Sequence, residues 1–223
     1  MSGHRAYIPT TADRLVKAAM TTAGRLPGGL LRPIAGSPRQ LDGQTLDTHF
    51  QAGLRVIALM SRGEYEDLAL EEARKTLERS AFTASGDRVD LAVVLPLAGD
   101  DPARADLSAR LYSPVGTDEV LPMLVYFHGG GWTLGSIDSH DSTCRFIARE
   151  GGLKVLSVDY RLAPEFPFPT AVEDCLASFR YVRDNAVELG VDATRIAVGG
   201  DSAGGNLATV VCHLTRDAGE TMP

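Results

Sequence analysis

Residues 195–208 read RIAVGGDSAGGNLA, and this stretch decides the fold. A short apolar run passes directly into a turn of small residues and then into an apolar helical segment. Gly200 to Gly204 fit the pattern G-x-S-x-G, with a strand before it and a helix after it. Backbone crowds the flanking positions of such a turn, so they accept almost no side chain, and the serine hydroxyl points out of the sheet. The pattern predicts Ser202 as a nucleophile, with Asp201 as a structural neighbour.

A second motif lies upstream, where the apolar run 123–127 (MLVYF) ends in HGGGW (128–132). Acyl transfer through a tetrahedral intermediate needs several donors aimed at the developing alkoxide. Backbone N–H groups converge in this way where side chains are absent. A phosphate cradle would need the Lys-Ser/Thr of a P-loop, and a dinucleotide site would need spaced glycines, and this run has neither. The loop therefore predicts an oxyanion hole, with Gly131 and Trp132 as supporting residues.

The strands around these motifs indicate an α/β fold. Continuous apolar runs at 121–127, 155–160 and 195–200 alternate with helical segments, which is typical of parallel strands covered on both faces. Before them, two stretches of alternating residues predict an antiparallel pair joined by a turn at 98–106. The alternating residues are Val89, Leu91 and Val93, then Leu107, Ala109 and Leu111.

The sequence predicts a helix between the second and third parallel strands. Val172, Cys175, Phe179 and Val182 form one apolar stripe, which makes Cys175 a core residue. Pro169 marks the expected start of this helix. Gly190 marks the expected end.

Residues 1–85 carry helical patterns, and we expect a helical cap there, followed by a partial catalytic domain over 86–223. Two apolar series recur at helix spacing, while the Pro and Gly residues of 26–38 predict a loop between helices. The series are Phe50, Leu54, Ile57 and Met60, then Leu70, Ala73, Leu77 and Ala81.

Three motifs occur in order along the chain: HGGGW (128–132), DYRLAPEFPFPTAVED (159–174) and GDSAGGNLA (200–208). Because of these motifs, residues 85–220 resemble the bacterial hormone-sensitive-lipase-like esterases. The resemblance implies an α/β-hydrolase fold whose mostly parallel sheet is flanked by helices, and an amino-terminal cap that encloses an acyl pocket. It implies Ser202 as the nucleophile and a buttressing role for 161–165. It also implies that the oxyanion donors are the amides of Gly129, Gly130 and Ala203.

The chain departs from the family in the partners of the serine. The fold supplies first a carboxylate and then a histidine after the nucleophile, but after Ser202 the 223 residues offer only His213, Asp217 and Glu220. His213 lies eleven positions along the helix, about 16 Å away by axial rise, and cannot reach the serine.

The other histidines do not fill this gap. His4, His49 and His140 could serve only by an arrangement foreign to the fold, and His128 is expected to be structural, shaping the glycine loop. We therefore expect a fragment or truncated product of a longer esterase, with its sheet incomplete at the C-terminus. Such a chain would be poorly soluble and have little activity.

The composition of the chain limits the kinds of partner that can be expected. A formal net charge of -7 with scattered basic residues gives no field that would attract nucleic acid, and no stretch is apolar enough for a membrane span. The three cysteines are far apart, so neither a disulfide framework nor a metal site is indicated, and a cytoplasmic location follows. A small apolar ester is the expected substrate, no cofactor is expected, and the oligomeric state stays open.

Two alternatives remain open at the level of sequence. A non-catalytic small-molecule binder on the same scaffold, as in plant gibberellin receptors, would explain the missing histidine, although it has no need of a formed oxyanion hole. An amide hydrolase would use the same apparatus, because leaving-group choice depends on pocket shape and on the general acid.

Overall fold

The computed structural model describes residues 7–60, 65–86, 93–96, 108–114 and 119–223. Residue contacts divide the chain into two compact units, Tyr7–Asp87 and Arg88–Pro223, which we call the helical unit and the sheet unit. Each is described by itself. The expected boundary near residue 85 and the role of the first unit as a cap stay predictions.

The helical unit contains four α-helices among its described residues. They are α1 (Thr11–Gly24), α2 (Gly28–Ala35), α3 (Thr48–Met60) and α4 (Leu70–Ala84), with a 3-10 turn at Tyr65–Asp67. Thr10 and Asp13 form a capping box at the start of α1. The Asp13 carboxylate is almost fully buried and also forms an ion pair with Arg79 of α4, at 2.6 Å. This pair fastens α1 to α4.

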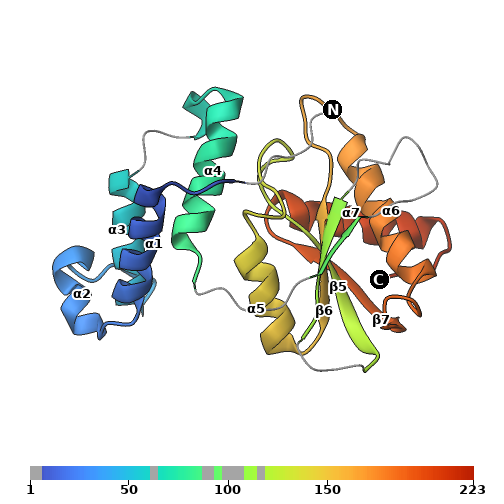
Figure 1. Cartoon of the computed structure of the whole chain (residues 1–223), viewed down its shortest axis with the longest axis horizontal. Helices are drawn as coiled ribbons and strands as arrows, with labels where there is room; N and C mark the ends of the chain where they lie inside the picture. The colour runs from blue at the N-terminus through green and yellow to red at the C-terminus, as the bar shows by residue number, and fades with distance from the viewer. Residues whose placement is uncertain (1–6, 61–64, 87–92, 97–107, 115–118) are drawn as a thin grey trace. The chain divides into compact units, whose positions relative to one another are not determined.

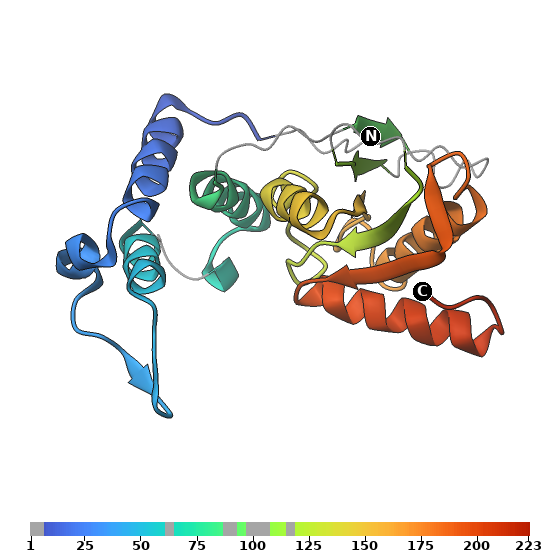
Figure 2. The same cartoon turned by 90° about the horizontal axis from the view of Figure 1, so that it is seen from below.

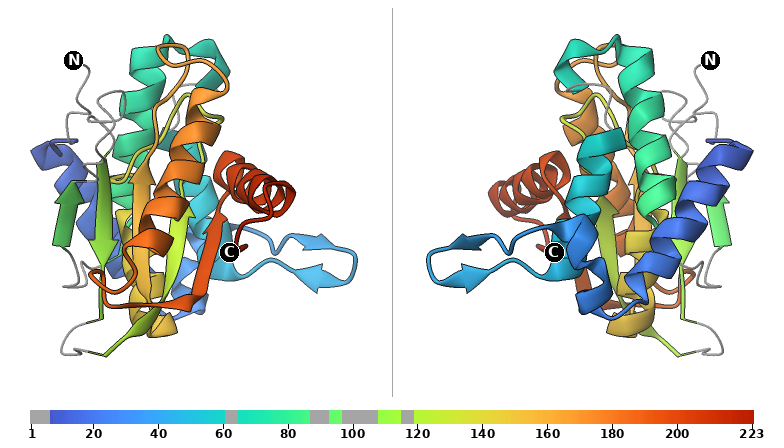
Figure 3. Two further views of the ribbon diagram at one scale, coloured as in Figure 1. Left: turned by 90° about the vertical axis from the view of Figure 1, so that its right-hand side faces the viewer. Right: turned by 90° about the vertical axis from the view of Figure 1, so that its left-hand side faces the viewer.

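The prediction of a loop over residues 26–38 is wrong, because α2 occupies most of it. Pro27 precedes the helix, and Pro33 lies inside it. Leu31 and Ala35 are buried against Ala52 of α3, and this burial outweighs the poor helix propensity of the local sequence. A short hairpin also interrupts the expected all-helical pattern. It consists of β1 (Gln40–Leu41) and β2 (Gln44–Thr45), and it projects from the helices of its own unit (Figure 3).

The helix predicted around Phe50 to Met60 is confirmed as α3, but its buried face is a different one. Gln51 and Ala52 are buried, whereas Phe50, Leu54 and Ile57 are exposed. The Gln51 amide group donates to the carbonyls of Ala35 and Ser37, at 2.6 and 2.7 Å. These bonds satisfy carbonyls at the end of α2 that the helix itself leaves without a partner.

The sheet unit has five strands in the part that the structure describes, and four of them point the same way. The strands are β3 (Val93–Pro96), β4 (Ser108–Tyr112), β5 (Leu121–Phe127), β6 (Lys154–Asp159) and β7 (Val191–Gly200), in the order β3-β4-β6-β5-β7. β5 pairs in parallel with β6 and with β7, and β4 runs antiparallel to β3 and β6. The predicted parallel strands and the antiparallel pair are confirmed. Val89, Leu91, Leu107 and the turn at 98–106 lie outside the described residues.

Helices cover both faces of this sheet (Figure 1). α5 (Asp141–Gly151) packs on one face, and α6 (Thr170–Asp184) and α7 (Ala203–Asp217) pack on the other. Side chains alternate along β5, so that Tyr126 faces α5 while Val125 and Phe127 face α6 and α7. The α/β architecture expected from the sequence is confirmed.

The stripe predicted for α6 is confirmed, and Cys175 is fully buried in it. The predicted end of that helix is wrong. α6 stops at Asp184, where the Asn185 side chain donates to the carbonyl of Tyr181, at 2.8 Å. Gly190, with φ of 62°, instead forms the turn into β7. No helix among the described residues is both long and apolar enough to cross a bilayer.

Candidate active site

Ser202 lies with Asp201 in the turn between β7 and α7. β7 ends at Gly200 and α7 begins at Ala203, with α7 lying along β7 (Figure 2). The serine has φ of 50° and ψ of -117°, a conformation that costs a side-chain-bearing residue free energy. Its side chain is exposed. In the described part of the chain its hydroxyl has no hydrogen-bond partner, which leaves it free for an incoming group.

The glycines around the turn are required by a close approach of β5. A Cβ atom at Gly200 would lie 2.1 Å from the Phe127 carbonyl oxygen, and one at Gly204 would lie 1.9 Å from the same oxygen. Both separations are impossible for real atoms. The turn is therefore pressed against the end of β5, as the small residues of the sequence predict.

The glycine loop emerges beside this turn because β5 and β7 are neighbours. Phe127 is paired with Gly200 in the parallel register, so the segments that follow the two strands leave the sheet at the same edge. Gly130, Gly131 and Trp132 all have positive φ, at 123°, 60° and 60°. A Cβ atom at Gly130 would lie 2.2 Å from the Leu134 carbonyl oxygen. The loop folds back tightly on itself, and glycine is required at its centre.

A carboxylate ties the two segments together. Asp201 Oδ1 accepts hydrogen bonds from the Gly129 amide at 3.0 Å and from the Tyr126 hydroxyl at 2.7 Å. His140 Nε2 lies 3.2 Å from the same oxygen. The hydrogen bond from His140, with those from Tyr126 and Gly129, holds the pKa of Asp201 well below its usual range. The ionised Asp201 carboxylate thus links the serine turn to the glycine loop.

The hydrogen bond from the Gly129 amide to Asp201 changes the expected set of oxyanion donors. The Gly129 amide, expected to face the oxyanion, is already bonded to Asp201. Among the described residues, the amides of Gly130, Gly131 and Ala203 have no hydrogen-bond acceptor. Gly131, which we expected only as a supporting residue, therefore takes the place of Gly129 as a candidate donor. Sequence spacing could not show which glycine amide the carboxylate would occupy.

His128 holds the loop from the other side. Its ring is fully buried and stacks on Tyr160, with ring centroids 4.2 Å apart. Its Nδ1 lies 2.8 Å from the Gly129 carbonyl oxygen, and because a carbonyl only accepts, Nδ1 carries the proton. The Tyr160 hydroxyl donates to the His128 carbonyl at 2.7 Å. These contacts support the structural role expected for His128.

The segment after β6 supports the glycine loop. The Ala163 amide donates to the Trp132 carbonyl at 2.9 Å. Arg161 binds the fully buried Asp174 carboxylate of α6 through its backbone amide, its Nε and its Nη2, at 2.7–3.0 Å. This is the buttress that the sequence resemblance implied. Trp132 itself is 42% exposed.

Among the described residues, no histidine forms a hydrogen bond with Ser202. His213 is exposed and lies well along the continuous helix α7. His49 Nε2 contacts the Leu26 carbonyl within the helical unit, at 2.8 Å. His140 faces Asp201, and His4 lies outside the described residues. Tyr126 and His140 are the site residues that sequence reasoning missed as partners of Asp201, because no local motif connects them to Ser202.

Comparison with known proteins agrees with this geometry. Residues 124–223 match the model of a family with the alpha/beta hydrolase fold. The carboxylic ester hydrolase LipN of Mycobacterium tuberculosis is 39% identical over 215 residues, which are 95% of this chain and 51% of that protein. The ethyl acetate hydrolase of Pseudomonas putida is 43% identical over 150 residues, or 66% of this chain and 46% of that protein.

A solved structure gives the same result. The ester hydrolase EH1AB1 from the metagenome of Lake Arreo, solved with a derivative of bipyridine phosphonate, matches with a TM-score of 0.68 and 42% identity. The match covers 76% of this chain and 54% of that one. The chain spans about half the length of the curated relatives it matches. The strained serine turn, the glycine loop and these likenesses together show that the chain has the α/β-hydrolase fold and is similar to hormone-sensitive-lipase-like esterases.

Proposed function

We propose that the protein is a serine carboxylesterase that hydrolyses small apolar esters through an acyl-enzyme. One observation carries the proposal: the exposed hydroxyl of Ser202 lies on a strained turn beside the glycine loop, where the Gly130 and Gly131 amides bind no acceptor among the described residues. A nucleophile next to unpaired backbone donors is the arrangement that stabilises a tetrahedral oxyanion.

The chemistry follows in two steps. The Ser202 oxygen attacks the ester carbonyl while its proton passes to a histidine base, and the oxyanion is held by the amides of Gly130, Gly131 and Ala203. The C–O bond then breaks, the alcohol leaves with the proton, and the acyl group stays on the serine. Water, deprotonated by the same base, releases the acid and restores the hydroxyl.

The base and its carboxylate are proposed to lie in a part of the protein that these 223 residues do not include, since the relatives are about twice as long. The chain of 1–223 should therefore hydrolyse a p-nitrophenyl ester far more slowly than a full-length relative and should be poorly soluble. Measurement of turnover and of the soluble fraction checks this. Turnover close to that of a relative would mean that a residue within the chain is the base.

Removal of the nucleophile is the direct test. In the full-length protein, Ser202→Ala should abolish the burst of p-nitrophenol that accompanies acylation, because no acyl-enzyme can form. Stopped-flow absorbance measures the burst, and a matched Ser37→Ala change at an exposed position of the helical unit serves for comparison. A burst of unchanged size in Ser202→Ala would eliminate Ser202 as nucleophile. Ester binding without turnover in the unsubstituted protein would favour the non-catalytic binder.

Two features support the proposed substrate and location. Trp132 exposes part of its indole at the glycine loop, which suits an apolar acyl or alcohol group. Cys144, Cys175 and Cys212 are all free thiols, which suits a reducing compartment, and we propose the cytoplasm.

A further inference from the structure

We propose that His140 is a positioning residue for acyl transfer. It holds the Asp201 carboxylate, and through that carboxylate it sets the glycine loop against the serine turn. The inference rests on the proposed function and extends it to a residue outside the motifs of the sequence.

The first step is the contact itself. His140 Nε2 lies 3.2 Å from Asp201 Oδ1, and the His140 side chain is only 15% exposed. An ionised carboxylate only accepts hydrogen bonds, so Nε2 carries the proton and donates it toward Asp201. The Tyr126 hydroxyl and the Gly129 amide donate to the same oxygen. The carboxylate thus accepts from three donors. Tyr126 belongs to β5 and Gly129 to the loop that follows it, whereas His140 comes from the segment before α5.

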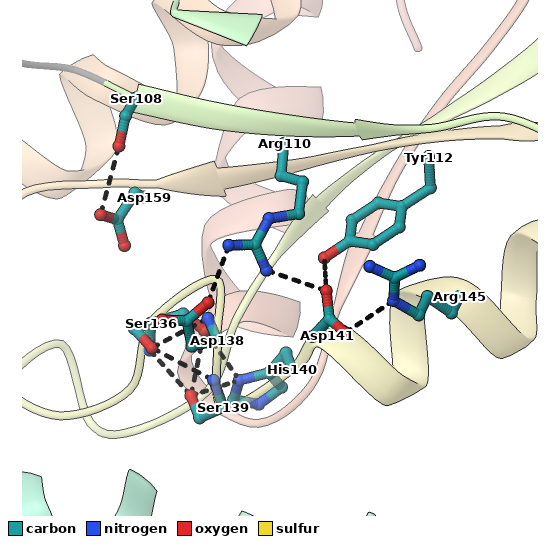
Figure 4. A network of polar contacts seen from close by, with 10 residues as sticks. All are labelled: Ser108, Arg110, Tyr112, Ser136, Asp138, Ser139, His140, Asp141, Arg145 and Asp159. Atoms are coloured by element: carbon teal, nitrogen blue, oxygen red, sulfur yellow. Dashed lines mark hydrogen bonds and ion pairs between the residues drawn. The ribbon is translucent and has the colours of Figure 1, made fainter. Parts of the chain in front are cut away.

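The second step is how His140 is itself held in place (Figure 4). Its Nδ1 lies 3.0 Å from Ser139 Oγ and 3.4 Å from the Ser136 carbonyl oxygen. The Ser136 hydroxyl accepts from the amides of Asp138 and Ser139, and Ser139 Oγ accepts from the Ser136 amide. The segment 136–140 is therefore a closed set of polar contacts around the imidazole.

Partly buried ion pairs anchor this segment to the sheet. Arg110 of β4 binds Asp138 at 2.7 Å and Asp141 at 2.8 Å. Asp141 also accepts from the Tyr112 hydroxyl and from Arg145 Nε. Figure 4 shows Arg110 between the two carboxylates that flank His140. These contacts connect the segment that carries the imidazole to β4 and α5.

The third step connects this segment to the oxyanion donors. The Gly129 amide is held by Asp201, and the Gly129 carbonyl is held by His128 Nδ1. In a trans peptide the carbonyl and the next N–H point in opposite directions, so fixing the Gly129 carbonyl also fixes the direction of the Gly130 N–H. Asp201 holds the peptide before this one, whose N–H is that of Gly129, so displacement of Asp201 would shift Gly129 and with it the Gly130 donor. It would also move Ser202, the residue next to Asp201.

The predicted consequence is a loss in kcat with little change in KM, because oxyanion donors act on the transition state more than on the bound ester. In the full-length protein we expect His140→Leu to lower kcat for p-nitrophenyl butyrate about tenfold, the effect of losing one charge-assisted hydrogen bond. His140→Gln keeps an N–H donor near the position of Nε2 and should restore kcat to within about threefold.

The experiment pairs these variants with an inhibitor that mimics the tetrahedral state. An alkyl trifluoromethyl ketone forms an adduct whose oxyanion needs the same donors, so its inhibition constant should rise in His140→Leu by about the factor that kcat/KM falls. His213→Leu is the matched control, since His213 is exposed on α7, and its kinetics should stay unchanged. The unfolding temperature of each variant separates a local effect from general destabilisation.

The outcomes are distinct. If unsubstituted protein shows no hydrolysis that depends on Ser202, the proposed function fails and this inference fails with it. If that activity is present but His140→Leu matches the unsubstituted protein, the inference alone is overturned. It is also overturned if His140→Leu lowers kcat and inhibitor affinity by unrelated factors, or if His140→Gln gives no recovery while unfolding at the same temperature as the unsubstituted protein.

Discussion

At the scale of single residues, Ser202 holds the most demanding conformation of the site. With φ of 50° and ψ of -117°, its Cβ is strained against its own backbone, and the surrounding contacts must maintain the geometry. The Phe127 carbonyl pressed against Gly200 and Gly204 supplies one such constraint, since it fixes the turn at both ends. The protein gives up some stability at this residue to expose the hydroxyl.

Substitution of Ser202 separates the backbone strain from the hydroxyl. Ser202→Gly should be more stable than Ser202→Ala by about 1 kcal/mol, because glycine adopts positive φ without the steric cost that alanine retains. Both variants lack the nucleophile, so their difference reports on backbone conformation. Guanidinium unfolding of the two variants measures it. Equal stabilities, or a less stable glycine variant, would show that the turn is relaxed.

At the scale of elements, one buried ion pair joins α6 to the segment after β6. The Asp174 carboxylate has no exposed surface and accepts three hydrogen bonds from Arg161. The same segment supports the glycine loop through the bond from Ala163 to Trp132. Removal of one partner would leave a guanidinium without its carboxylate in a largely buried position, which is costly.

We expect Asp174→Ala to lower the free energy of unfolding by about 3 kcal/mol. Asp184→Ala, at the exposed end of the same helix, is the matched control. The Asp184 side chain is 60% exposed in its pair with Arg183, so its loss should cost about 1 kcal/mol or less. Urea unfolding curves for both variants provide the comparison. Similar losses from the two changes would contradict the importance given to the buried pair.

At the scale of the whole molecule, acidic groups with lowered pKa values contribute to the way stability responds to pH. Hydrogen bonds from Arg180 and Arg183 lower the pKa of Glu220 to about 2, and hydrogen bonds from Thr194 and Arg195 lower that of Asp192 to about 2. Their pKa values are lower in the folded chain than in the unfolded chain. Their stabilising effect is therefore present above the unfolded pKa of about 4 and is lost as the pH falls toward about 2.

The unfolding temperature should accordingly change little from about pH 7 to pH 5 and fall progressively below about pH 4. Glu220→Gln removes one of the responsible groups, so this variant should be less stable at pH 7 and should lose less stability on acidification. Circular dichroism melts between about pH 2 and pH 7 test both statements. Parallel curves for the two proteins would mean that Glu220 does not contribute.

Much of the molecule was predictable from sequence. The strands β5, β6 and β7, the helix α7 and the turn at Ser202 follow from contiguous patterns, in which each residue reports on its immediate neighbours. Gly200 and Gly204 belong to this group, since a tight turn requires small residues close together in the chain. The helix α2 does not, because its formation over a stretch rich in Pro and Gly depends on burial against α3.

The local chemistry of the serine turn was thus determined by sequence alone, whereas the assignment of partners was decided by tertiary structure. Tyr126 and Asp201 are 75 positions apart, and they meet because β5 and β7 are adjacent in parallel register. His140 reaches the same carboxylate from a segment anchored to β4 by Arg110. The Gly129 amide is occupied for the same reason: a hydrogen bond depends on position in space, and distant strands set that position.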